Sequence, residues 1–156
     1  MGISLWRGKF NKSTGSLLLD KTNGSGSVEV TVELASIDFG HDKLNEWAAS
    51  AEFFDAARFP TATYRGTLSG FGSESPRVTG TLSMRGVSRQ LDLQVNVFKC
   101  IPHPLWQRDY CGADATGRFR RDDFGLDAGK AYGFDMDVVL RIQVEALAEK
   151  LIKSPD

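Results

Sequence analysis

Apolar and polar residues alternate one by one along much of this chain, and that pattern restricts what the chain can fold into. From Ser27 to Leu34 every second residue is valine or leucine, and the residues between them are serine, threonine or glutamate. The segment from Gln90 to Val97 repeats the pattern. Successive side chains of a β-strand point to opposite faces, so each segment is predicted to be a strand with one buried and one wet face.

Further strands are predicted on both sides of these two. A long one spans Phe134–Ala146, where only Val139 interrupts the alternation, and weaker alternation over Ala62–Leu68 and Val78–Met84 predicts a hairpin. Turn residues favour antiparallel neighbours. Glycine-containing turns lie at residues 70–72 and 85–88 and at 21–26, where the turn joins Gly15–Asp20 to the strand that follows.

Helical spacing replaces the alternation in one segment, Gly40–Phe54. Residues suited to one buried face recur there three or four positions apart, which predicts one short helix, with Asp42 or Asp38 capping its first turn. The residues at helical spacing are His41, Leu44, Trp47 and Ala48. Many strands with one helix indicate a β-sandwich or a β-barrel, and the residues alone favour neither.

The chain is expected to form one domain over residues 1–149, followed by a polar tail over residues 150–156. Its 156 residues suit a single core, and 19 basic against 20 acidic side chains give a net charge of -1. Nucleic acid is therefore not an expected partner. Because the aliphatic runs are far shorter than the roughly 20 residues of a spanning helix, no membrane span is expected.

Two cysteines, Cys100 and Cys111, lie on either side of a short segment between predicted strands. Their spacing does not match the C-x-x-C of redox and zinc motifs, so no metal site is predicted, and the pair is expected to form a disulfide. Disulfides persist mainly in oxidising compartments, which favours the bacterial periplasm. The N-terminus shows no export signal, and a cytoplasmic location is expected if Met1 is the true start.

Several segments resemble the YceI family of lipocalin-like, polyisoprenoid-binding proteins. The similarity begins at Arg7–Phe10, continues at Val32–Asp38 and is most specific at Phe53–Pro60, where the sequence is Phe-Phe-Asp-Ala-Ala-Arg-Phe-Pro. The segments 78–89, 112–117 and 121–125 carry the rest of the similarity. The resemblance therefore covers nearly the whole chain.

This resemblance implies an all-β, lipocalin-like antiparallel β-barrel of about eight strands with one short helix. It also implies a lengthwise apolar tunnel that holds an isoprenoid quinone or polyprenyl lipid, with no other cofactor required. Family members usually carry an additional first strand before the segment that corresponds to Gly2–Phe10. Without that strand the barrel would have an open seam, so we expect a mis-assigned start or a truncation that also removed a signal peptide.

The candidate lining of the tunnel consists of the inward apolar rows and an aromatic cluster near one end. The alternative is that the same side chains pack on one another as an ordinary core, because residue type does not separate a filled interior from a hollow one. The candidates are Val30, Val32, Leu82, Met84, Leu93, Val95, Val138, Leu140 and Ile142, with Phe53, Phe54 and Phe59 at the mouth.

Polar candidates are few. Arg85 and Arg89 are candidate contacts for a phosphate or quinone head group, and the alternative is a solvated turn. Asp122 and Asp123 would point to opposite faces of a strand, so a turn is expected there rather than a catalytic pair. No known catalytic motif occurs, and no catalytic residue is predicted. The two histidines, His41 and His103, are expected to be structural.

Three functional hypotheses follow from these observations. The first is non-enzymatic binding, transport or storage of a long-chain isoprenoid lipid inside the barrel. The second is a barrel with a solid core that acts as a stress-related interaction module, for example as a homodimer. The third is an enzyme that acts on a lipid head group. A hollow interior would distinguish the first from the second, and buried polar groups beside the tunnel would favour the third.

Overall fold

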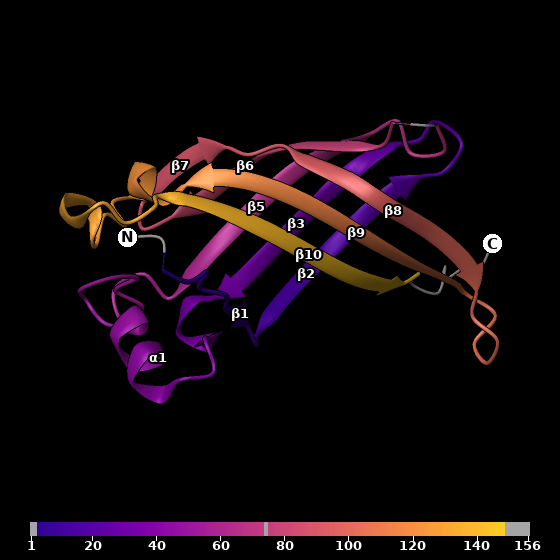
Figure 1. Ribbon diagram of the computed structural model, residues 1–156. Coiled ribbons are helices and arrows are strands. Elements are labelled where there is room, and N and C mark those ends of the chain that lie inside the picture. Colours follow the sequence, from indigo (N-terminus) through magenta and orange to yellow (C-terminus); the bar gives the residue numbers. More distant parts are fainter. Residues whose placement is uncertain (1–2, 74, 149–156) are drawn as a thin grey trace.

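A computed structural model describes residues 3–73 and 75–148, and the expected tail over 150–156 lies outside the described residues. One curled antiparallel sheet dominates the fold, with the order β10-β9-β8-β6-β5-β3-β2 and with β7 paired to β6 (Figure 1). Its strands are β2 (Ser13–Asp20), β3 (Ser25–Glu33), β5 (Thr61–Ser69), β6 (Arg77–Met84), β7 (Val87–Gln90), β8 (Leu93–Pro102), β9 (Asp109–Arg120) and β10 (Asp137–Leu147).

Smaller elements gather at one end of this sheet (Figure 1). They are the two-stranded pair of β1 (Lys9–Phe10) with β4 (Ile37–Asp38), the helix α1 (Asp42–Ala49), and the 3-10 turns η1 (Leu34–Ser36), η2 (Arg121–Phe124) and η3 (Lys130–Tyr132). The opposite end carries the loop between β8 and β9. The predicted all-β architecture is thus confirmed as a half-barrel, with one short α-helix among the described residues.

The predicted helix is present, but neither of the two expected aspartates is its N-cap. His41 takes the N-cap position, and its Nδ1 atom accepts a hydrogen bond from the Leu44 amide at 3.3 Å. Asp38 instead accepts hydrogen bonds from the Gly40 amide at 2.8 Å and from the Asn45 side chain at 3.2 Å. Asp38 therefore fixes the backbone just before the helix, and His41 caps the helix.

A bulge in β8 overturns the expectation that alternation continues to Val97. The register with β9 shifts between Val95 and Val97, so side chains after the bulge point to the opposite face from the one that the alternation predicts. Leu93 and Val95 are 8% exposed, whereas Val97 is 59% exposed and Phe98 packs inward in its place. A single inserted residue thus exchanges the two faces for the rest of the strand.

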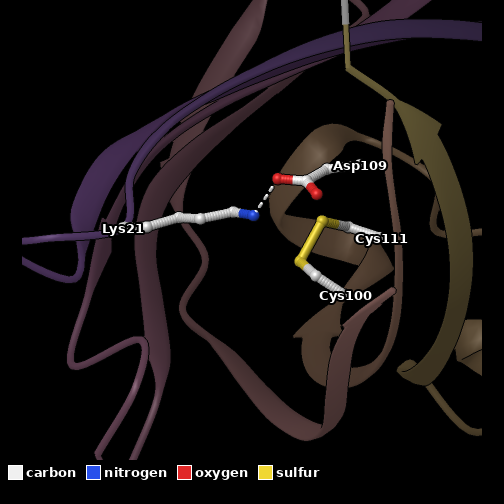
Figure 2. The surroundings of a disulfide bond; sticks show 4 residues. All are labelled: Lys21, Cys100, Asp109 and Cys111. Atoms are coloured by element: carbon white, nitrogen blue, oxygen red, sulfur yellow. Dashed lines mark hydrogen bonds and ion pairs between the residues drawn. A yellow bond between two sulfur atoms is a disulfide. The ribbon is translucent and has the colours of Figure 1, made fainter. Parts of the chain in front are cut away.

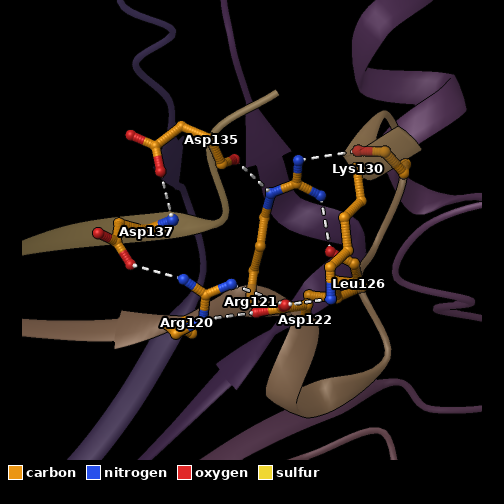
Figure 3. A network of polar contacts seen from close by, with 8 residues as sticks. Arg120, Arg121, Asp122, Leu126, Lys130, Asp135 and Asp137 are labelled. Carbon is orange, nitrogen blue, oxygen red and sulfur yellow. Dashed lines mark hydrogen bonds and ion pairs between the residues drawn. The ribbon is translucent and has the colours of Figure 1, made fainter. Parts of the chain in front are cut away.

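The segment before β10 is more irregular than the alternation from Phe134 predicts. β10 begins at Asp137, Phe134 is 43% exposed, and Met136 is buried at the end of the loop. Arg121 organises this segment by donating to three backbone carbonyls, those of Leu126 (2.6 Å), Ala128 (2.8 Å) and Asp135 (3.2 Å), as Figure 3 shows. A half-buried cation thus holds this segment in place of a strand ladder.

The sheet does not close on itself within the described residues. β2 pairs with β3 alone and β10 pairs with β9 alone, and within the described residues no ladder joins β2 to β10. We call this the open seam between β2 and β10. It agrees with the seam expected from the sequence.

Candidate ligand-binding interior

The buried residues form two clusters that follow one another along the inside of the curled sheet. The first cluster lies beside α1 and includes Phe54 and Met84, and the second lies under the centre of the sheet and includes Leu93 and Val95. Leu82 and Phe119 pack against both clusters. The inner face is therefore a continuous apolar surface from one end of the sheet toward the other.

The predicted lining residues are divided between these clusters. Phe53, Phe54 and Met84 belong to the first, and Leu82 joins the two. Those that belong to the second are Val30, Leu93, Val95, Leu140 and Ile142. Three others, Val32, Phe59 and Val138, are partly buried without belonging to either cluster.

Burial of the inner face decreases toward the open seam. Central strands bury their inward side chains, with Leu68 2% and Val78 6% exposed. The inward rows of the two edge strands, including Leu17, Leu140 and Ile142, are only partly buried although they are equally apolar. Apolar lining is thus partly accessible along both sides of the seam.

Aromatic rings close the end of the interior beside α1. The Phe53 and Phe54 rings meet edge to face with centroids 4.9 Å apart, and Trp47 lies 5.0 Å from Phe53. Phe10 contributes a ring 5.8 Å from Phe54. Phe53 and Phe54 were predicted as lining residues. Phe10 was not, because it stands in a two-residue strand that is too short for alternation to be recognised.

Two basic side chains lie near this aromatic end. Arg85 donates from Nη1 to the Phe124 carbonyl at 3.1 Å, while its buried Nε atom makes no hydrogen bond. Arg89 stands opposite Leu82 in the β6–β7 ladder, which places it on the inner face of the sheet, although it is exposed. Within the described part of the chain neither arginine forms an ion pair with a carboxylate.

Tyr64 is a buried polar residue of the interior that sequence analysis did not include in the lining. Its ring lies over Gly66 and Gly80, which face each other in the β5–β6 ladder, and its hydroxyl donates to the Leu91 carbonyl at 2.8 Å. Burial raises the pKa of Tyr64 to about 12, so the phenol stays protonated and donates. The alternation signal gives a tyrosine the same weight as an aliphatic residue, and therefore does not reveal this contact.

The carboxylates and histidines are spread apart in the structure. Asp122 accepts two hydrogen bonds from Arg120 and one from Lys130, which together hold its pKa at about 2 (Figure 3). His41 caps the helix, and His103 stacks on Trp106 in the distant β8–β9 loop. No group of three or more metal-ligating side chains gathers anywhere in residues 3–73 and 75–148.

A pocket of about 660 Å³ lies on the other side of the sheet. Outward hydroxyl and charged side chains line it, with Arg65 and Glu29 forming an ion pair at 3.3 Å. None of the predicted lining residues contributes to it. Its lining residues include Ser16, Leu18, Ser27, Glu29, Arg65, Thr67, Thr79, Thr81 and Gln90.

A curled antiparallel sheet with an apolar inner face, an aromatic end and a disulfide-linked hairpin defines a half-barrel of the β-barrel class. The chain belongs to the YceI-like domain family, whose model matches residues 1–146. It is 31% identical over 153 residues to a UPF0312 protein of an Enterobacter species, covering 96% of this chain and 78% of that one.

Solved structures show the same fold. A Campylobacter jejuni YCEI protein matches with a TM-score of 0.83 at 22% identity, over 96% of this chain and 89% of that chain. A polyisoprenoid binding domain from Saccharophagus degradans matches with a TM-score of 0.58 at 16% identity, over 90% and 85% of the two chains. The described helices are too short or too polar to cross a bilayer.

Proposed function

We propose that this protein binds a long-chain isoprenoid lipid, of the quinone or polyprenyl type, without chemical conversion. Membership of the YceI-like family and the structural likeness to a domain described as polyisoprenoid binding support this function. The lipid lies along the apolar inner face of the curled sheet. The disulfide supports a periplasmic location, since such bonds persist in oxidising compartments.

One observation carries the proposal: apolar side chains remain partly accessible along the inside of the open seam. Leu17 and Leu19 of β2 face the seam from one side, and Leu140 and Ile142 of β10 face it from the other. An apolar tail gains about 0.8 kcal/mol for each methylene that it removes from water. A ligand lying there would complete the burial that the central strands already have.

The basic groups at the aromatic end suit a polar head group. Arg85 brings a buried Nε donor that makes no hydrogen bond, and Arg89 brings an exposed guanidinium on the same side of the sheet as Leu82. A phosphate or a quinone oxygen would accept from these donors. The tail would then extend from this end under the centre of the sheet.

The test is organic extraction of protein purified from its native host, followed by mass spectrometry of the extract. A stoichiometric isoprenoid supports the proposal and identifies the ligand. An extract without lipid, from folded and full-length protein, would contradict it and favour a solid-core barrel that acts as an interaction module. A chemically altered lipid product would instead favour an enzyme acting on the head group.

A pair of neighbouring substitutions tests the placement of the ligand. Leu140→Arg puts a charge on the inner face and is expected to abolish lipid retention, because an unpaired charge is costly to bury. Arg141→Ala changes the outward neighbour and is expected to leave lipid retention unchanged. Circular dichroism confirms folding of both variants, and equal losses of lipid from both would contradict the assigned register.

A further inference from the structure

The loop between β8 and β9 presents large apolar side chains to water. Figure 1 shows this loop projecting beyond the end of the sheet, opposite α1. Leu105 is 78% exposed, Trp106 is 55% exposed, and Ile101 at the base of the loop is 45% exposed. Two large apolar side chains are therefore exposed on the projecting loop, and a third is exposed at its base.

The tip is ordered by its own contacts. The His103 ring stacks on Trp106 with centroids 4.3 Å apart, and its Nδ1 atom accepts from the Leu105 amide at 3.2 Å. Backbone hydrogen bonds join His103 to Arg108 (2.6 Å) and to Gln107 (3.1 Å). These contacts order the Trp106 ring and the backbone of the loop, so binding a partner requires little additional ordering.

A disulfide fixes the base of the loop. Cys100 and Cys111 face each other across the β8–β9 ladder and are joined by their sulfur atoms (Figure 2). Next to them, Lys21 of the β2–β3 turn forms an ion pair with Asp109, the first residue of β9. The disulfide thereby joins the two strands of the hairpin, and the ion pair joins the hairpin to the β2–β3 turn.

Basic side chains outnumber carboxylates around the loop: Lys21, Lys99 and Arg108 lie there with Asp109 and with Glu145, which accepts a hydrogen bond from the Tyr110 hydroxyl. Asp109 is neutralised by Lys21, whereas Arg108 lies over the Trp106 ring at 5.8 Å and donates to the Ala148 carbonyl. In the described part of the chain neither Arg108 nor the exposed Lys99 has a carboxylate ion-pair partner. An anionic surface would complement this end of the molecule.

Shape and area favour a bilayer over a protein as the occupant. A tryptophan side chain offers about 150–250 Å² in full, so the exposed parts of three apolar side chains amount to roughly 400 Å². A stable protein interface takes about 800 Å² from each partner. A narrow tip of leucine and isoleucine with tryptophan beside basic groups matches the chemistry of the lipid head-group region instead.

We infer that the β8–β9 loop docks this protein onto the surface of an anionic lipid bilayer. Leu105 enters the boundary of the acyl chains, Trp106 and Ile101 lie at the level of the head groups, and Arg108 and Lys99 face the lipid phosphates. This inference goes beyond lipid binding in the interior, because it requires no occupant there.

Co-sedimentation with vesicles of phosphatidylcholine and phosphatidylglycerol tests the inference. The full chain is expected to bind them, with a blue shift of tryptophan fluorescence as Trp106 leaves water. A double variant, Leu105→Asn with Trp106→Ala, is expected to bind at least about tenfold more weakly, because two large side chains lose their burial. Arg108→Gln is expected to weaken binding to these vesicles and not to pure phosphatidylcholine.

Leu18→Asn is the matched control, since Leu18 is 73% exposed on the outer face of β2, far from the loop in sequence. An equal loss of vesicle binding from Leu18→Asn, or full binding by the double variant, would overturn the inference. So would a loss caused only by Trp6→Ala in the exposed N-terminal segment.

A dimer that the double variant abolishes, without vesicle binding, would show a second copy as the occupant. Assays on delipidated protein separate these outcomes from a failure of interior lipid binding.

Discussion

At the scale of single residues, the contact of Tyr64 with two glycines shows how the interior is filled. Gly66 and Gly80 stand opposite each other, and the tyrosine ring covers both. A Cβ atom at position 80 would lie 2.4 Å from the Tyr64 Oη and 2.6 Å from the Arg65 carbonyl oxygen. The absence of side chains at these two positions is what admits the ring.

Gly80→Ala is therefore expected to destabilise the fold by about 1–3 kcal/mol, because the ring and its hydrogen bond to Leu91 must shift. Urea unfolding monitored by circular dichroism measures the change. Gly112→Ala is the control, since the nearest atom to its Cβ would be the Val144 carbonyl oxygen at 3.8 Å. It is expected to be neutral or slightly stabilising. Equal stability of the two variants would show that the ring does not need the glycine.

The sequence-based prediction of the inner face is correct where a strand carries no bulge. Leu93 and Val95 alternate and are buried, and the two cysteines pair as expected. It was wrong for Val97, because a bulge is set by backbone pairing that residue type does not show. It also assigned the helix cap to an aspartate, because histidine is a rarer acceptor at that position.

At the scale of elements, the segment between β9 and β10 depends on two neighbouring side chains of η2. Arg121 fastens the backbone of residues 126–135, and Asp122 links Arg120 of β9 to Lys130 of η3 (Figure 3). The Asp122 side chain is 9% exposed. Its two hydrogen-bonded cations lower the pKa of this carboxyl from 3.8 to about 2.

The lowered pKa of Asp122 predicts a pH-dependent contribution to stability. The folded state favours the charged carboxylate, so the contribution is fully present above about pH 4 and is lost as the pH falls toward about 2. Asp122→Asn is expected to lower the Tm by a few degrees near neutral pH, and this difference from the parent should shrink between those two pH values. Thermal unfolding at a series of pH values measures it. A constant difference would assign the loss to hydrogen-bond geometry rather than to charge.

The strand β9 could not be predicted by alternation, because the inward positions along its middle are occupied by small residues. Ala113, Ala115 and Gly117 face the interior, and a Cβ atom at position 117 would lie 2.7 Å from Leu93. Small residues there make room for the large side chains of β8. Alternation is recognised by large apolar residues at every second position, and β9 lacks them because it makes room for the side chains of β8.

At the scale of the whole molecule, the open seam determines whether the apolar interior is accessible from the side of the sheet. Alternation predicts which face of each strand is apolar, and it cannot predict whether the first and last strands meet, because that depends on the curvature of the whole sheet. Six ladders connect β2 to β10 through β3, β5, β6, β8 and β9 in the described residues. The seam between β2 and β10 depends on the combined curvature of all of these ladders.

Amide hydrogen exchange tests the seam directly. Along β2 and β10 every second amide points away from the single partner strand, so we expect alternate amides there to exchange rapidly. Amides of β5, which pairs with both β3 and β6, are expected to be protected throughout. Protection of the β2 and β10 edges that rises with protein concentration would reveal a homodimer joined through them. Protection independent of concentration would instead mean that the two edges close in solution, and lipid would then have to enter through an end of the barrel.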